Sequence, residues 1–246
     1  MKCSSEGRLS NRTKSLEPSG IMAIFEKAQA IKDVIRLEVG EPDFDTPGHI
    51  KDAAKRALEK GFTHYTSSAG IFPLREAIAE KTKKETGVDV DPIKEVVVTD
   101  GGSCALTLAM MATLNPGDEV LVSDPGWPYG PGIKMAEGIP VRYGLLEEEG
   151  FRIDFNDLRS KISSKSKIIL INSPNNPTGS VLDRRELETL SEIALENDLL
   201  VISDEVYEKL VYDTQHVSVL SLPEMRDRTV LVNSFSKTYA MTGWRV

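Results

Sequence analysis

Polar residues whose types could do chemistry follow five short apolar runs of the sequence. Exposed backbone amides at a helix start favour phosphate, a carboxylate pairs with a cation, and a lysine amine can react with a carbonyl group. In a parallel sheet such residues meet, because ligands bind beyond the carboxyl ends of the strands. The five groups are Asp100-Gly101-Gly102-Ser103, Pro125-Gly126-Trp127, the stretch from Ser173 to Gly179, Asp204-Glu205 with Tyr207, and Ser234-Phe235-Ser236-Lys237.

Each group taken alone has an ordinary structural explanation. A Gly-Gly-Ser before a helix is more often a tight turn than an anion site, and Asn-Asn-Pro-Thr-Gly has the composition of a turn. Trp127 beside prolines would usually be a packing residue, and Asp204 would be a helix cap or a loop acid. A single lysine such as Lys237 is usually exposed. The joint occurrence of five groups at five strand ends favours one binding site.

The elements that would position these groups begin at about residue 94. Short β-branched runs alternate there with helical stretches, which indicates a mainly parallel sheet with helices on both faces, a three-layer α/β/α fold. The runs are EVVVT, EVLVSD, IPVRY, KIILIN, LLVISD and TVLVNS, and the clearest helices are SCALTLAMMATL and DRRELETLSEIALEND. Asp183 is expected to cap the second helix, with Glu186 at the capping-box position.

The first part of the chain has a different pattern. Residues 1–18 are polar, rich in serine and arginine, and aperiodic, which predicts a mobile arm. Ser19 is expected to cap a helix over 21–32, and Pro47 to open a helix that Gly61 ends. A further helix is expected over 73–85.

Composition bounds the class of protein. The chain has 246 residues, 40% hydrophobic and 28% charged, and is long enough to bury a core. Its net charge of -8 argues against nucleic acid or an anionic membrane surface as the main partner and favours a small-molecule site. Cys3 and Cys104 are too few for a disulfide framework, and no metal-ligand spacing involves them. No apolar run approaches a membrane span, so we expect a cytoplasmic protein.

Five separated motifs carry a resemblance to a known family. They are Gly40-Glu41-Pro42-Asp43-Phe44, Tyr65-Thr66, Asn175-Asn176-Pro177-Thr178-Gly179, Ser203-Asp204-Glu205-Val206-Tyr207 and SFSKTYAMTGWR. In order and spacing they resemble the class I aminotransferases of the aspartate aminotransferase superfamily, which are fold type I enzymes that use pyridoxal 5'-phosphate (PLP). The resemblance runs from about Leu9 to Val246. It implies the PLP-binding large domain of that fold, in a homodimer that moves an amino group between an amino acid and a 2-oxo acid.

The resemblance also implies a catalytic set. Lys237 would bind the cofactor's aldehyde and then carry the proton from the substrate's α-carbon to the cofactor. Asp204 would pair with the ring nitrogen, because the ring withdraws electrons only while that nitrogen is protonated. Glu205 would then be structural. Asn176 and Tyr207 would hydrogen-bond the ring's phenolate oxygen, and Asn176 would also touch the substrate carboxylate.

The remaining implied contacts concern the phosphate, the ring face and the substrate. Trp127 corresponds to the aromatic residue that stacks on the ring and also contacts the substrate, and Gly40 corresponds to a backbone position next to the substrate. Tyr65 matches a tyrosine that reaches the phosphate from the neighbouring subunit, so the site would be complete only in a dimer. Asp100 stands where many relatives have an uncharged residue. The residues that match the phosphate cup are Gly102, Ser103, Ser234, Ser236 and Arg245.

Family members usually run well over a hundred residues further than Val246. The resemblance therefore implies that the last strand of the large domain is absent here. Most of the small domain, with the arginine that binds the substrate's α-carboxylate, would be absent as well. The expected organisation is an arm at 1–18, a small-domain segment at 19–46 and an incomplete large domain at 47–246. We expect these residues alone to be inactive.

Several alternatives stay open. A PLP-dependent β-lyase or a cyclopropane-forming synthase would use the same lysine, aspartate and arginine. A non-catalytic PLP-binding or effector-sensing module, or a degenerate inactive fragment, would keep the fold without the reaction. The identity of the amino acid and of the 2-oxo acid is not readable, because the residues that select them are expected in the missing region and across the dimer interface.

Overall fold

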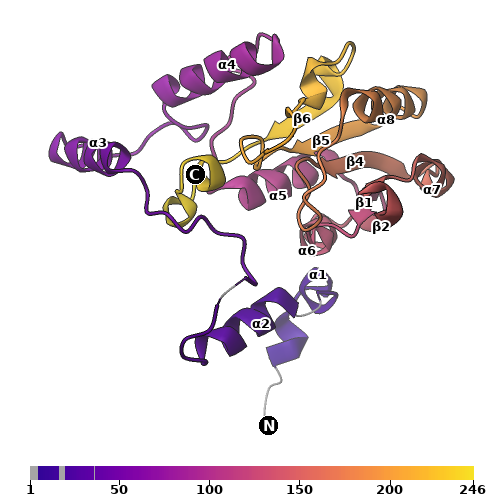
Figure 1. Cartoon of the computed structure of the whole chain (residues 1–246), viewed down its shortest axis with the longest axis horizontal. Helices are drawn as coiled ribbons and strands as arrows, with labels where there is room; N and C mark the ends of the chain where they lie inside the picture. The colour runs from indigo at the N-terminus through magenta and orange to yellow at the C-terminus, as the bar shows by residue number, and fades with distance from the viewer. Residues whose placement is uncertain (1–4, 17–19, 36) are drawn as a thin grey trace.

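Six strands in the described part of the chain form one central sheet (Figure 1). The structure is a computed structural model that describes residues 5–16, 20–35 and 37–246. The strand order is β3-β2-β1-β4-β5-β6, and all neighbours are parallel except β2 and β3. The strands are β1 (Glu119–Asp124), β2 (Ile139–Leu146), β3 (Arg152–Ile153), β4 (Ser166–Asn172), β5 (Leu200–Asp204) and β6 (Thr229–Val232). The mainly parallel sheet is thereby confirmed.

Alternation along the strands builds one apolar layer on each face of the sheet. Successive side chains of a strand point to opposite faces, so each strand contributes to both layers. α5 (Gly102–Thr113) and α6 (Gly130–Met135) cover one face, and α7 (Phe155–Lys161) and α8 (Arg184–Glu196) cover the other. The strand residues of the first layer include Val120, Ile168, Leu170 and Ile202, and those of the second include Leu121, Ile169, Ile171 and Val201. The three-layer arrangement is confirmed.

Several helix boundaries fall where local sequence signals place them. Asp183 and Glu186 form the capping box of α8, with Glu186 N donating to Asp183 Oδ1 at 2.9 Å and Asp183 N to Glu186 Oε2 at 3.1 Å. α3 (Gly48–Glu59) directly follows Pro47. Ser19 lies outside the described residues, and the helix after it, α2, spans Gly20–Gln29. The other helices are η1 (Ser5–Arg8), α1 (Asn11–Lys14), α4 (Phe72–Thr86), η2 (Glu147–Glu149), η3 (Val219–Ser221), η4 (Arg226–Arg228), α9 (Phe235–Thr238) and η5 (Thr242–Trp244).

The strand predicted over EVVVT is wrong for this structure. Residues 96–99 pair with no strand, although Val98 N donates to Ala69 O at 3.0 Å. A cavity of about 680 Å³, lined by Val97 and Val98 on one side and by Val230 and Leu231 on the other, separates this segment from the edge strand β6. A β-branched run forms a strand only when a neighbouring strand pairs with it, and no strand in the described part of the chain pairs with this segment.

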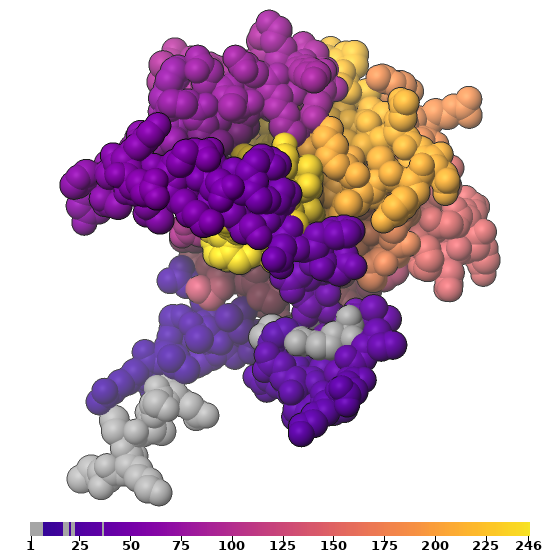
Figure 2. Space-filling view, turned by 60° about the vertical axis from the view of Figure 1, so that its left-hand side comes forward, coloured from indigo at the N-terminus to yellow at the C-terminus, as the bar shows by residue number. Residues whose placement is uncertain are grey.

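The N-terminal segments lie beside the sheet rather than inside it. α3 has no buried residue and stands away from the strands (Figure 1). In the space-filling view the purple N-terminal segments lie against the yellow C-terminal loop (Figure 2). Thr46 Oγ1 donates to the Ala240 carbonyl, and Trp244 Nε1 donates to Thr46 Oγ1 at 3.0 Å. The domain boundaries near residues 18 and 46 stay predictions.

Within the described residues, no helix has both the length and the apolar character needed to span a membrane.

Candidate active site

The carboxyl ends of β4, β5 and β6 and the amino end of α5 open into a single cleft of about 1260 Å³. The structure brings together in it every site residue expected from the sequence except Tyr65, whose side chain is fully exposed elsewhere on the molecule. The cleft residues among them are Gly40, Gly102, Ser103, Trp127, Asn176, Asp204, Tyr207, Ser234, Ser236, Lys237 and Arg245.

Asp204 ends β5 and is a buried carboxylate at the base of the cleft, only 5% exposed. The Tyr129 hydroxyl donates to its Oδ2 at 2.7 Å, and the Val206 amide lies 3.4 Å from its Oδ1. Burial raises the pKa of Asp204 to about 6, and the bond from Tyr129 opposes that rise. A cation bound beside this carboxylate would relieve the cost of its burial.

Lys237 lies in the short helix α9, directly after β6, with its side chain half-buried. Its ammonium donates to the Gly40 carbonyl and stands 5.7 Å from the centre of the Tyr207 ring. Burial lowers the pKa of Lys237, the nearby Glu41 carboxylate raises it, and the Arg245 guanidinium lowers it. The net depression makes the neutral, nucleophilic amine more accessible than on an exposed lysine.

Asn176 and Tyr207 form a pair of polar groups at the same edge. Asn176 Nδ2 donates to the Tyr207 hydroxyl at 3.1 Å. The Asn176 backbone amide in turn donates to Asn172 Oδ1 at 2.7 Å, which fixes the loop after β4. Burial raises the pKa of Tyr207, so its hydroxyl remains protonated and can donate to an oxygen anion.

A cup of hydrogen-bond donors, here called the anion cup because its donors suit an anion, lies at the amino end of α5. No side chain caps this helix, so its first amides remain available to a ligand. The Arg245 guanidinium is held beside them by the Thr242 and Asp100 carbonyls, at 2.9 and 3.4 Å. Ser234 Oγ donates to Ser236 Oγ at 2.9 Å on the other side of the cup. Amides, hydroxyls and a guanidinium are the donors that a phosphate needs, and Asp100 contributes only its carbonyl to the contact with Arg245.

Two neighbours of these groups, Asn172 and Tyr129, were missed from the sequence, and Gly101 was expected only as part of the Asp100-Gly101-Gly102-Ser103 group. Asn172 Nδ2 donates to the Asp204 carbonyl at 3.0 Å, and as the polar last residue of an apolar run it could have been found. Gly101 has φ of +82°, and a side chain there would overlap the Arg245 guanidinium. Tyr129 gave no signal, because it follows an irregular Pro-Gly-Trp-Pro segment without periodicity.

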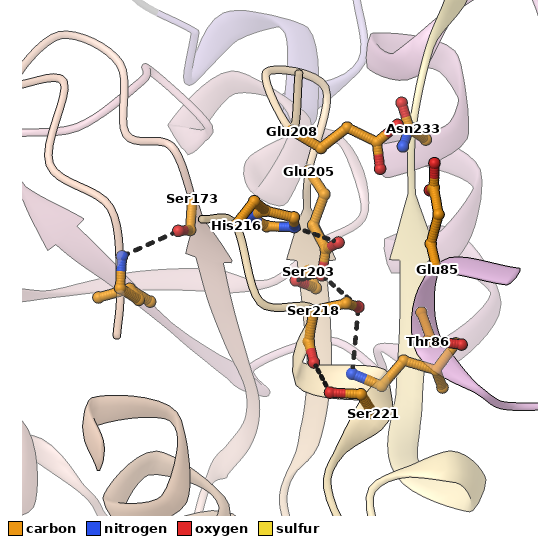
Figure 3. A network of polar contacts seen from close by, with 12 residues as sticks. Glu85, Thr86, Ser173, Ser203, Glu205, Glu208, His216, Ser218, Ser221 and Asn233 are labelled. Carbon is orange, nitrogen blue, oxygen red and sulfur yellow. Dashed lines mark hydrogen bonds and ion pairs between the residues drawn. The ribbon is translucent and has the colours of Figure 1, made fainter. Parts of the chain in front are cut away.

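Glu205 faces the opposite side of the sheet from Asp204 and does not line the cleft. Its carboxylate, 2% exposed, accepts hydrogen bonds from the Ser203 and Ser218 hydroxyls at 2.8 Å each and lies 2.8 Å from His216 Nε2 (Figure 3). Glu208, beside this network, accepts from the Lys81 ammonium. Ligand atoms of Glu205, Glu208 and His216 lie within 4.8 Å of one another, but Lys81 already occupies the place of a cation at Glu208.

Together, the mainly parallel α/β sheet, the half-buried lysine, the buried carboxylate and the anion cup define a class of protein, an α/β domain with a ligand-sized cleft at the carboxyl edge of its sheet. Comparison with known proteins identifies the family within this class. The model of the family "Aminotransferase class I and II" matches residues 32–246. The chain therefore belongs to the class I and II aminotransferase family.

Individual relatives agree with this family. An aspartate aminotransferase of Pyrococcus abyssi is 48% identical over 240 residues, which are 97% of this chain and 62% of the relative. Aromatic-amino-acid aminotransferase 2 of Thermococcus litoralis is 45% identical over the same shares of the two chains. A solved structure of Thermus thermophilus aspartate aminotransferase with maleate superposes with a TM-score of 0.92 at 44% identity, covering 96% of this chain and 63% of that one. The chain thus spans about 62% of the length of these curated relatives.

Proposed function

We propose that this chain is the cofactor-binding part of an aminotransferase that uses PLP to move an amino group between an amino acid and a 2-oxo acid. The observation that carries the proposal is the presence, in one cleft, of the amine of Lys237, the buried carboxylate of Asp204 and the anion cup beside Arg245. These three groups match the aldehyde, the ring nitrogen and the phosphate of PLP. The names of the relatives support the same reaction class.

The donor set of the cleft fits this cofactor. When bound, PLP supplies an aldehyde that condenses with amines and a protonated ring that withdraws electrons from the substrate's α-carbon. The buried Asp204, whose pKa burial raises, gains a cationic neighbour if the ring nitrogen is protonated. The absence of a side chain on Gly101 leaves room for the Arg245 guanidinium next to the first amides of α5. Gly102, Ser103, Ser234 and Ser236 complete the proposed cup.

Each proposed role then follows from the chemistry of the side chain. Lys237 would hold the cofactor's aldehyde through Nζ, and the same amine, when free, would take the proton from the substrate's α-carbon. Asp204 would pair with the ring nitrogen and favour its protonated form. Asn176 and Tyr207 would donate hydrogen bonds to the phenolate oxygen of the ring. Trp127 would lie against the ring, and Gly40 would border the substrate.

A homodimer is part of the proposal. Leu58, Phe62 and Tyr65 are 64%, 72% and 108% exposed, and neither α3 nor the first residues of the loop after it include a buried residue. Exposed apolar surface of this kind is typical of an interface. Tyr65 would then reach the phosphate bound by the partner subunit. We also propose that the protein works in the cytoplasm, since its relatives are metabolic enzymes by name and its described helices include no membrane span.

The test is a single-turnover reaction of the PLP-loaded protein, carrying a relative's C-terminal region, with a panel of amino acids. Transamination releases one equivalent of 2-oxo acid and no ammonia. A β-lyase or a cyclopropane-forming synthase on the same scaffold would instead release ammonia or a cyclic product in repeated turnovers. Lys237→Ala should abolish release and also the covalent retention of PLP after borohydride reduction. An adduct on a different lysine would refute the assignment of Lys237.

A further inference from the structure

The hydroxyl of Tyr129 faces the one carboxylate of the cleft that we assign to the ring nitrogen. We propose that Tyr129 is a positioning residue, which holds the Asp204 carboxylate in its ionised form and in a fixed orientation toward the cofactor's ring nitrogen. This inference rests on the proposed PLP chemistry of the cleft. It adds a residue outside all five sequence motifs that carry the resemblance.

Tyr129 makes the shorter of the two hydrogen bonds to the Asp204 carboxylate. The tyrosine precedes the first residue of α6 and is itself 6% exposed, packed in the apolar layer with Met110 and Ile133. Its hydroxyl lies 2.7 Å from Asp204 Oδ2, whereas the Val206 amide lies 3.4 Å from Oδ1 and makes at most a weak bond. Oδ2 is thus fixed by a strong donor, and the lone pairs of Oδ1 remain for a ligand.

The proton in this contact belongs to the tyrosine. Burial and the adjacent Asp204 charge both raise the pKa of Tyr129 well above its ordinary value, so the phenol stays protonated. A neutral hydroxyl that donates to a carboxylate favours the charged form of the acid. Tyr129 therefore opposes the effect of burial, which favours protonation of Asp204 itself. A protonated Asp204 could not serve as counter-ion to a protonated ring.

The backbone around Asp204 is held independently of Tyr129. The Asn172 side chain donates to the Asp204 carbonyl at 3.0 Å, and the next residue, Glu205, is fixed on the opposite face by Ser203, Ser218 and His216 (Figure 3). With the main chain so restrained, removing the tyrosine hydroxyl frees the rotation of the carboxylate without moving β5. The expected effect is local to the ring-nitrogen contact.

The experiment compares the affinity of the protein for PLP with its affinity for an analogue in which carbon replaces the ring nitrogen. In the wild type, PLP should bind more tightly than the analogue, because only PLP can pair with Asp204. Tyr129→Phe should reduce this preference about tenfold, the usual worth of a hydrogen bond to a charged group. Tyr143→Phe removes another buried tyrosine hydroxyl, one that makes no bond to Asp204, and should leave the preference unchanged.

Each outcome decides between the possibilities. If Tyr129→Phe weakens PLP and the analogue equally, the tyrosine only fills space and the inference is overturned. If the variant folds poorly, 3-fluorotyrosine at position 129 keeps the ring volume and makes the hydroxyl a stronger donor. The preference for PLP should then be kept or raised, and a fall would overturn the inference. If the wild type binds no PLP at all, the proposed function fails, and the inference falls with it.

Discussion

The Arg245 guanidinium occupies the space that a side chain on Gly101 would fill. The two residues are far apart in the sequence, yet the glycine at the start of α5 and the arginine after η5 form one wall of the anion cup. Gly101 has φ of +82° and ψ of 169°, a backbone conformation that is essentially confined to glycine. Glycine at this position therefore permits the turn and leaves room for the Arg245 guanidinium beside the first amides of α5.

Gly101→Ala should weaken the binding of PLP about tenfold, because the methyl group displaces Arg245 from the phosphate. It should also lower the free energy of unfolding by about 1–3 kcal/mol through backbone strain. Gly117→Ala is the matched control, since Gly117 has φ of +92° and open space around it, so it should share the strain and keep the affinity. Titration with PLP and with pyridoxal, which lacks the phosphate, measures the effect. An equal loss for both ligands would contradict the phosphate role.

Asp204→Asn should stabilise the cofactor-free protein at neutral pH. The folded pKa of Asp204, about 6, lies above its ordinary value of 3.8, chiefly through burial and in small part through the neighbouring Glu205 charge. Because this pKa is raised in the folded state, the contribution of Asp204 to the free energy of unfolding is fully present below about pH 4 and is lost as the pH rises through 6. A difference of about 2 in pKa corresponds to about 3 kcal/mol, the expected gain of the variant above pH 6. Denaturant unfolding between pH 4 and 8 checks this, with the exposed Asp213→Asn as control.

In the loaded enzyme, the same variant should retain PLP but lose several orders of magnitude in the rate of the amino-acid half-reaction. The charge of Asp204 in a dry site is expected to contribute about 3–5 kcal/mol to that rate. A variant with higher stability than the wild type at pH 8 and almost no activity would be the signature of a functional carboxylate. A gain in stability that is the same at all pH values would show that ionisation of Asp204 is not its cause.

Glu205→Gln should destabilise the protein and leave the cofactor site intact, whereas Asp204→Asn should stabilise the protein and impair the site. Its carboxylate is buried among Ser203, Ser218 and His216, and an amide group satisfies only part of those donors. We expect a loss of about 2 kcal/mol in the free energy of unfolding and an unchanged preference for PLP over the nitrogen-free analogue. A large change in that preference, with an unchanged free energy of unfolding, would show that Glu205 contributes to cofactor binding.

Much of the sheet and of the candidate site was predictable from the sequence, because the polar site residues directly follow apolar strands. The register of Ile169, Ile171 and Asn172 follows from alternation in KIILIN, and the same alternation directs Asp204 and Glu205 to opposite faces of the sheet. The capping box of α8 was readable from two residues alone.

The rest depended on contacts that no local pattern encodes. EVVVT has strong β-propensity, yet residues 96–99 form no strand. Whether a segment pairs with a neighbouring strand depends on the tertiary structure, which the local sequence does not encode. β3 has two residues, α6 six and α7 seven, too few for a period to stand out. The bond of Tyr129 to Asp204 joins residues 75 positions apart and was invisible for the same reason.

A substrate carboxylate bound in the cleft would need a cation as its partner. The cations among the described cleft residues are Arg152, Lys237 and Arg245. Arg152 is bound to Asp183 and lies 3.1 Å from Glu186, and the other two are assigned to the aldehyde and the phosphate. None is left for a buried carboxylate, which normally takes a bidentate arginine. The chain spans about 62% of its relatives, so the required cation has room to come from their remaining length.

We therefore expect the amino-acid half-reaction to be at least about thirtyfold faster, in kcat/KM, when a relative's C-terminal region is joined to this chain. A charge-assisted pair of this kind contributes roughly 2–5 kcal/mol, and the orientation needed for proton transfer depends on it as well. The comparison is made at saturating PLP, so that cofactor binding does not limit either protein. Arg152→Gln is the decisive variant, because it removes the remaining cleft cation without touching the proposed cofactor contacts. If the shorter chain reacts equally fast and Arg152→Gln abolishes its rate, then Arg152 leaves Asp183 to bind the substrate, and the cleft is already complete without an added arginine.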